Sequence, residues 1–179
     1  MDPLDGTTNY LHRFPVYAVS IAAAFDGELL AGIVHHVPLD IRYTALHGGG
    51  ARQNDVPIAV SAVSDPGHAL IGTGTPFRDM SQWTRYHRQV EAVAASSAGI
   101  RRPGSAALDL CDVAAGRCDG FWELQLAPWD VAAGALLVRE AGGRVTDLDG
   151  RGDVLRHNPI VAGNPAIHRW LVETLRDSS

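Results

Sequence analysis

Apolar residues in the first third of the chain fall in short blocks, which is typical of strands. Two blocks, residues 16–25 and 29–37, are joined through Asp26-Gly27, a dipeptide that favours a tight hairpin turn. Shorter blocks at residues 42–46 and 56–60 continue the pattern, and the glycine run at residues 48–50 marks a turn between them. The first 60 residues are therefore predicted to form antiparallel strands.

From about residue 67 the pattern changes, and short apolar runs alternate with apolar residues at helical spacing. Ser105 and Asn164 are preferred N-cap residues, Pro128 suits the first turn of a helix, and Gly99, Gly116 and Gly142 suit helix ends. Helices are predicted at residues 79–97, 105–115 and 128–141, and a last helix is predicted to start at residue 164. Strands are predicted at residues 68–74, 119–124 and 160–163, and a further short strand is predicted to start at Val145.

Antiparallel strands followed by strands that alternate with helices predict an α/β layered fold (α+β), with sheets sandwiched by helices. The length of 179 residues and the hydrophobic content of 46% fit one globular domain over residues 1–179. The chain has no apolar run of bilayer length and no signal-peptide pattern, so we expect a cytoplasmic protein without a membrane partner. A net charge of −5 without a basic stripe argues against nucleic acid as a partner.

The stretch DPLDGTTNY at residues 2–10 contains two carboxylates, two threonine hydroxyls and an asparagine, and we predict that it forms a tight turn. Asp2 and Asp5 are three positions apart, so both carboxylates can converge on one cation, and oxygen ligands of this kind suit Mg²⁺. Gly6, Thr7 and Thr8 could offer N–H groups at a helix N-terminus, where the helix dipole favours a phosphate. The alternative is an ordinary surface turn without a ligand, since Asp, Gly and Thr are common turn residues.

A second acidic stretch, WELQLAPWDVAAG, lies at residues 122–134. Asp130 falls at the predicted start of a helix, where it could serve as a cap or as a third metal-binding carboxylate. Glu123 ends a predicted strand, where it is either a solvated acid or a group that faces a polar ligand.

Taken together, these segments resemble the inositol monophosphatase family. DPLDGTTNYLHRFPVYAVSIA resembles its first metal-binding signature and PWDVAAGALLVREAGG its second. The segments GIVHHVP, LIGTGTPFR and RRPGSAALDLCDVAAGRCDGFWE lie between them in the family's usual order, so the resemblance covers nearly the whole chain. DGTTNY is similar to the motif of bacterial inositol-1-phosphatases rather than to the DGTKN type of histidinol-phosphate phosphatases.

The resemblance implies an α-β-α-β-α layered phosphatase that uses Mg²⁺ to hydrolyse small phosphorylated polyols such as inositol 1-phosphate, usually as a homodimer. It implies that the Thr7 hydroxyl orients the attacking water and that Glu123 binds substrate hydroxyls. By position, the implied metal ligands are Asp2, Asp5, Asp130 and the Leu4 carbonyl; the other implied substrate contacts are Gly6, Thr7, Thr8, Ser105 and Ala106.

One departure from the family pattern concerns the start of the sequence. Members of the family carry a region before the first signature that contributes helices, a metal-binding glutamate pair and an acid that partners the motif threonine. Since this sequence starts inside the signature, we expect an N-terminally truncated fold that is weak or inactive by itself. The alternatives are a histidinol-phosphate or sugar-phosphate phosphatase on the same scaffold, and a non-catalytic remnant.

Overall fold

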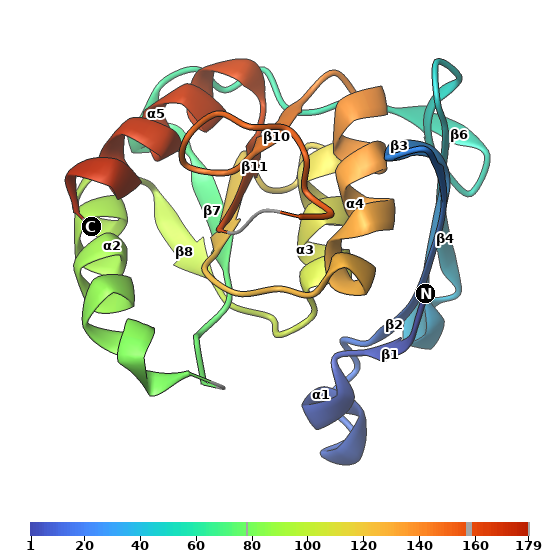
Figure 1. The fold of residues 1–179 in the computed structure, drawn as a ribbon, viewed down its shortest axis with the longest axis horizontal. Helices are drawn as coiled ribbons and strands as arrows, with labels where there is room; N and C mark the ends of the chain where they lie inside the picture. The colour runs from blue at the N-terminus through green and yellow to red at the C-terminus, as the bar shows by residue number, and fades with distance from the viewer. Residues whose placement is uncertain (78, 157–158, 179) are drawn as a thin grey trace.

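Two β-sheets and two pairs of helices are stacked in the order sheet, helices, sheet, helices (Figure 1). The structure is a computed structural model that describes residues 1–77, 79–156 and 159–178. Sheet A, from the N-terminal part of the chain, is a six-stranded antiparallel meander in the order β1-β2-β3-β4-β5-β6. Its strands are β1 (Asp2–Asp5), β2 (Ala18–Phe25), β3 (Glu28–His36), β4 (Ile41–Leu46), β5 (Gly50–Gln53) and β6 (Val56–Ile58).

Sheet B has five strands in the order β10-β11-β9-β7-β8. The strand β7 runs parallel to its neighbours β8 and β9, whereas β11 is antiparallel to both β9 and β10. This mixed pairing follows from the helices between the strands, because parallel neighbours need a long crossover. The strands are β7 (Leu70–Thr73), β8 (Gly99–Arg101), β9 (Gly120–Glu123), β10 (Arg144–Thr146) and β11 (Ile160–Gly163).

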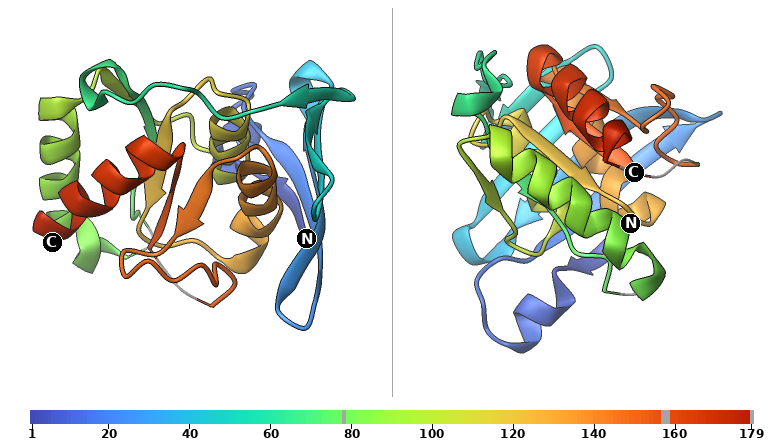
Figure 2. Two further views of the ribbon diagram at one scale, coloured as in Figure 1. Left: turned by 90° about the horizontal axis from the view of Figure 1, so that it is seen from above. Right: turned by 90° about the vertical axis from the view of Figure 1, so that its left-hand side faces the viewer.

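The helices α3 (Ala106–Ala114) and α4 (Pro128–Glu140) lie between the two sheets, and α2 (Trp83–Ser96) and α5 (Pro165–Asp177) cover the other face of sheet B (Figure 2). A short helix, α1 (Thr7–Leu11), follows β1. Short 3₁₀ turns occupy Val37–Leu39, Pro66–His68 and Met80–Gln82. In the described part of the chain, no helix has the length and apolar character that a membrane span requires.

Two apolar clusters hold the layers together. The first joins sheet A, α3, α4 and one face of sheet B, and the second lies between sheet B, α2 and α5. In the first cluster α3 and α4 approach closely at Gly134, where a Cβ would lie only 2.6 Å from Leu110 Cβ. In the second, Tyr86 of α2 stacks on Trp122 of β9 at 6.4 Å between ring centroids. The predicted layered α/β fold is thus confirmed.

Four local predictions were wrong. Residues 2–5 were predicted as a turn but form β1, because β2 offers them an open edge for pairing. The strand β5 was missed because the preceding glycines dominate the local signal, and β8 was missed because Gly99 was taken as a helix end. The helix predicted at residues 79–97 starts later, at Trp83, after a 3₁₀ turn. The other predicted elements agree with the structure to within a few residues.

The outer face of sheet A is apolar and exposed. Ile21, Phe25 and Leu46 are 42%, 75% and 63% exposed, and none of the described helices covers this face (Figure 2). Of the predicted α-β-α-β-α arrangement, the described residues therefore supply the four layers that start with sheet A.

We predict that stability falls at acid pH partly through His168, which is 6% exposed in α5. Burial and the positive charge of Arg144 lower the pKa of His168 to about 4, and its Nε2 lies 2.9 Å from Thr146 Oγ1. Since the unfolded chain binds this proton near pH 6.5, stability is present above that pH and lost between about 6.5 and 4.

The variant His168→Gln can keep the hydrogen bond to Thr146 without titrating. Between pH 7 and pH 5 its free energy of unfolding should fall by about 1–2 kcal/mol less than that of the unchanged protein. Urea unfolding at the two pH values measures this difference, and an identical pH dependence in both proteins would contradict the assignment.

Candidate metal centre

The strand β1 presents both of its carboxylates to one side of sheet A. Side chains three positions apart in a regular strand point to opposite faces. Asp2 pairs with Ser20 and Asp5 with Ala18, so the step of three residues on β1 matches a step of two on β2. This irregularity works as a bulge and brings Asp2 and Asp5 to the same side. The Leu4 N–H donates to Asp2 Oδ1 at 2.9 Å and fixes the first carboxylate.

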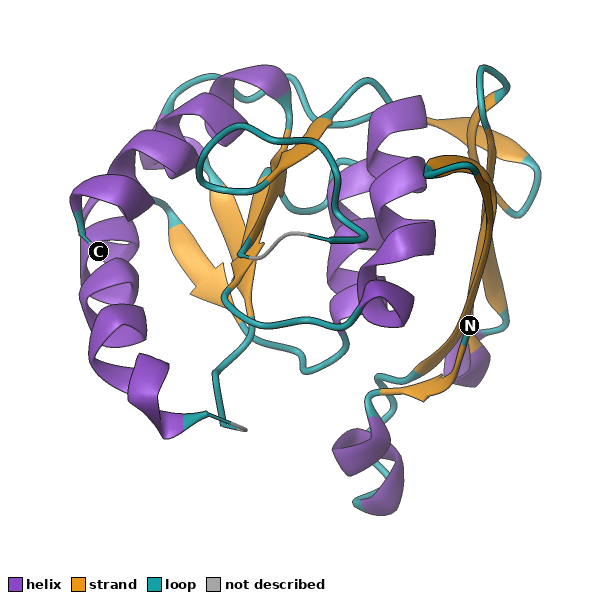
Figure 3. Ribbon diagram, viewed as in Figure 1, coloured by secondary structure: helices purple, strands orange, loops and turns teal. Residues whose placement is uncertain are grey.

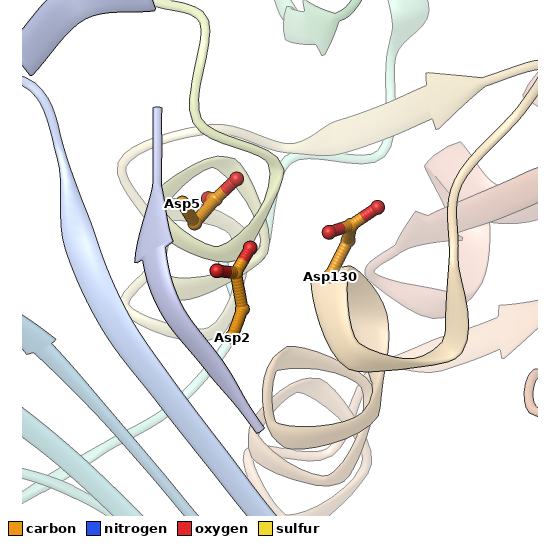
Figure 4. A group of neighbouring side chains, drawn as sticks. All are labelled: Asp2, Asp5 and Asp130. Carbon is orange, nitrogen blue, oxygen red and sulfur yellow. The ribbon is translucent and has the colours of Figure 1, made fainter. Parts of the chain in front are cut away.

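The third carboxylate comes from the start of α4. Asp130 is the third residue of this helix, and its Oδ2 accepts a hydrogen bond from the Ala127 N–H at 2.8 Å. The predicted capping role of Asp130 is therefore confirmed, and its carboxylate also faces β1, whereas its role as a metal ligand stays a prediction. Ligand oxygens of Asp2, Asp5 and Asp130 all lie within 4.8 Å of one another (Figure 4).

Burial dominates the electrostatics of this cluster. Burial raises the pKa of Asp5 to about 6, hydrogen bonds from Ser105 and Ala107 act in the opposite direction, and the charges of Asp130 and Asp2 raise it further. A divalent cation would relieve the repulsion, and a set of oxygen ligands alone suits Mg²⁺. The residues present therefore fit the predicted ion.

Two contacts from α3 hold the Asp5 carboxylate. The Ser105 hydroxyl donates to Asp5 Oδ2 at 2.5 Å, and the Ala107 N–H donates to the same oxygen at 2.9 Å. Ser105 is 1% exposed and is also the N-cap of α3, accepting from the Leu108 N–H at 3.4 Å. The structure thus places Ser105 and its neighbour Ala106, which were predicted at the substrate pocket, beside the carboxylate cluster.

Gly6 makes the turn from β1 into α1. Its φ of 81° lies in the left-handed region, and a Cβ there would approach the Val16 carbonyl oxygen to 2.7 Å, so only glycine fits. The N–H groups of Thr7 and Thr8 belong to the first turn of α1 and have no acceptor within the helix. The Thr7 hydroxyl donates to the Leu4 carbonyl at 2.8 Å. The predicted helix start at this turn is confirmed.

Glu123 ends β9 on the face of sheet B that contacts α3, where it is half-buried. It is not part of the three-carboxylate cluster. Gly74 leaves the space that its carboxylate occupies, because a Cβ at that position would overlap it. Its binding of substrate hydroxyls stays a prediction.

Sequence reasoning missed how α1 and α3 are joined. Asn9 Nδ2 donates to the Val16 carbonyl at 2.8 Å and to the Pro103 carbonyl at 2.9 Å. The Ser105–Asp5 contact also spans 100 positions and was not predicted. No local signal could have revealed the Asn9–Pro103 or Ser105–Asp5 contact, because the partners are 94 and 100 positions apart in the sequence.

The comparisons with known proteins agree with this geometry. The model of the inositol monophosphatase family matches residues 1–179. An inositol-1-monophosphatase of Mesorhizobium japonicum is 46% identical over 98% of this chain, and the Nus factor SuhB of Pseudomonas aeruginosa is 45% identical over 98%. The chain spans 66% of the length of each of these two relatives. The crystal structure of the extragenic suppressor protein suhB from Bartonella henselae superposes with a TM-score of 0.93 at 47% identity, covering 97% of this chain and 67% of that one.

We predict that Mg²⁺ stabilises the folded chain and that this effect depends on the cluster. A ligand that binds only the folded state at 100 times its dissociation constant adds about 2.7 kcal/mol. The melting temperature of the unchanged protein should therefore rise with Mg²⁺, whereas that of Asp130→Asn should not. Thermal melts at increasing MgCl₂, with KCl of equal ionic strength as the control, measure the effect. Equal shifts in both proteins would place the ion elsewhere.

Proposed function

The chain belongs to the inositol monophosphatase family, and we propose that it hydrolyses phosphate monoesters of small polyols with Mg²⁺ as the cofactor. The convergence of Asp2, Asp5 and Asp130 carries this proposal, because three carboxylates in one cluster favour a divalent cation over any other ligand. The name of the Mesorhizobium relative makes inositol 1-phosphate the first substrate to test.

In the proposed mechanism the three carboxylates would hold the cation, and the Leu4 carbonyl would be a further ligand. The Leu4 oxygen has two lone pairs, and the Thr7 hydroxyl uses one of them, so the other is available. When bound, Mg²⁺ would neutralise phosphate charge and lower the pKa of a water molecule. The Ser105 hydroxyl and the Ala107 N–H hold Asp5 Oδ2, which leaves Oδ1 to face the cluster.

Phosphate binding is assigned to the turn between β1 and α1. The N–H groups of Gly6, Thr7 and Thr8 lie where a helix N-terminus attracts an anion. Because the Thr7 hydroxyl donates its proton to Leu4, its oxygen is left to accept a hydrogen bond from the water that attacks phosphorus. The attack breaks the ester P–O bond, and the products are inorganic phosphate and the free alcohol, without a covalent enzyme intermediate.

Substrate recognition is assigned to Glu123, Ser105 and Ala106. A carboxylate such as Glu123 accepts hydrogen bonds from alcohol groups, and Ser105 and Ala106 begin the helix that borders the metal centre. The same scaffold could take histidinol phosphate or a sugar phosphate, since hydroxyl-binding groups on the pocket loops decide between such substrates. These remain the alternative substrates, and a non-catalytic remnant remains the alternative role.

The partner and domain assignments stay proposals. We propose residues 1–179 as one domain of a homodimeric enzyme in the cytoplasm, with weak turnover by these residues alone. A direct nucleic-acid partner is not proposed, because the net charge is −5, although relatives such as the Pseudomonas protein carry the name Nus factor.

We predict that Asp5→Asn and Asp130→Asn each lower Mg²⁺-dependent release of phosphate by about 100-fold or more, since each removes a charged metal ligand. Initial rates with inositol 1-phosphate at saturating Mg²⁺ measure the loss. Asp112→Asn, in α3 but paired with Arg117, is the matched control and should keep its rate. A variant of the cluster that retains a tenth of the activity or more would contradict the ligand role.

We also predict a substrate order. The kcat/KM for inositol 1-phosphate should exceed that for histidinol phosphate, because the DGTTNY motif resembles that of bacterial inositol-1-phosphatases rather than that of histidinol-phosphate phosphatases. Parallel initial-rate measurements at one Mg²⁺ concentration decide the order. A reversed ratio would show that the subgroup assignment is wrong while leaving phosphatase activity itself in place.

A further inference from the structure

The hydroxyl group of Ser20 in β2 is buried and has no hydrogen-bond partner among the residues that the structure describes. Ser20 is 1% exposed, so solvent does not reach the group from outside. A buried hydroxyl without a partner lowers the stability of the fold, because it loses the hydrogen bonds that it makes with water in the unfolded chain. Alanine, which has the same shape without the hydroxyl, would avoid this cost.

Packing does not explain why a serine is present at this position. Side chains alternate along β2, so Ala18, Ser20 and Ala22 share the face that is covered by α4. Gly32 lies opposite Ala22 on the same face, where a Cβ would approach Ala133 Cα of α4 to 3.1 Å. Both neighbours of Ser20 along the strand are alanines, so the contact with the helix needs small side chains and no hydroxyl.

Across sheet A, Ser20 lies directly opposite a carboxylate of the candidate metal centre. Its two partners in the ladders are Asp2 of β1 and Val34 of β3. Residues that are directly opposite in antiparallel strands point to the same face, with Cβ atoms about 4.5–5.5 Å apart. At this separation, rotation about the Cα–Cβ bond of a serine can direct its O–H to a carboxylate on the next strand. Of the two partners, only Asp2 can accept that hydrogen bond.

The two carboxylates of β1 are held unequally. A serine hydroxyl, that of Ser105, donates to Asp5 Oδ2 at 2.5 Å. Within the described part of the chain Asp2 accepts one hydrogen bond, from the Leu4 N–H to Oδ1 at 2.9 Å. Each carboxylate of this strand therefore has a buried serine beside it, but only Ser105 has its carboxylate as a partner, whereas the hydroxyl of Ser20 is still available.

We propose that Ser20 is a positioning residue for the metal centre and that its hydroxyl donates to the Asp2 carboxylate when the cation is bound. The inference rests on the proposed function, in which Asp2 is a ligand of Mg²⁺. A carboxylate has about four lone pairs on its two oxygens, so Asp2 can bind the cation and accept from Ser20 together. Donors behind a metal ligand fix its orientation, and removal of one typically lowers metal affinity by about 10- to 100-fold.

The test measures metal affinity and metal-free stability in the same variant. In calorimetric titrations with MgCl₂, Ser20→Ala should raise the Kd about tenfold. In EDTA, its melting temperature should equal or exceed that of the unchanged protein, because the variant no longer buries an unpartnered hydroxyl. A role in packing alone would not give this pair of results, since a packing defect lowers the metal-free melting temperature.

A second serine provides the matched control. Ser97 Oγ is also buried and has no partner in the part of the chain that the structure describes, but Ser97 follows α2, on the other side of sheet B. Ser97→Ala removes the same kind of group and should leave the Kd for Mg²⁺ unchanged. Crystals grown with MnCl₂ give a direct view of the contact, and they should show Ser20 Oγ at about 2.5–3.0 Å from a carboxylate oxygen of Asp2.

The other outcomes overturn the proposal. An unchanged Kd in Ser20→Ala, which is expected if the hydroxyl only binds a buried water, would show that the positioning role is wrong. A weaker Kd together with a lower metal-free melting temperature, or a Ser20 hydroxyl bonded to another group in the crystals with Mn²⁺, would do the same. If the unchanged protein binds no Mg²⁺, the metal centre of the proposed function is wrong and the role of Ser20 with it.

Discussion

The close approach of three carboxylates is the constraint on which the candidate site depends. Asp2, Asp5 and Asp130 bring their ligand oxygens within 4.8 Å of one another, and burial raises the pKa of Asp5 to about 6. Without a cation such a cluster opposes folding, so hydrogen bonds from the surrounding backbone must hold it in place. The N–H groups of Leu4, Ala107 and Ala127 each donate to a different carboxylate of the cluster. These backbone donors therefore stabilise the ionised carboxylates, which is the state that binds a cation.

The layers of the fold supply these donors from distant parts of the sequence. Sheet A carries β1 at its edge, and a pair of helices, α3 and α4, lies between the sheets (Figure 3). The N-termini of α3 and α4 lie at the cluster, because Ser105 and Ala107 contact Asp5 and Asp130 is in the first turn of α4. Gly134 of α4 lets the two helices pack closely at Leu110 of α3. The positive ends of both helix dipoles therefore face the carboxylates, which favours the ionised state that a metal needs.

Much of this arrangement could be predicted from the sequence, because hairpin signals, caps and apolar spacing are local. The Asp26-Gly27 hairpin, the Ser105 cap and the Pro128 helix start all follow from neighbouring residues. The strand at residues 2–5 could not be predicted in this way, because its pairing with β2 and its bulge depend on residues 18 and 20. The three metal-ligand candidates were found through motifs, whereas the Ser105–Asp5 and Asn9–Pro103 contacts needed coordinates.

The most direct test of the account is the position of a bound ion. Mn²⁺ takes the same oxygen ligands as Mg²⁺ and can be located by anomalous scattering in crystals grown with MnCl₂. The account predicts an anomalous peak at about 2.0–2.3 Å from carboxylate oxygens of Asp2, Asp5 and Asp130. A fully occupied peak elsewhere, or none at the cluster at saturating Mn²⁺, would contradict it.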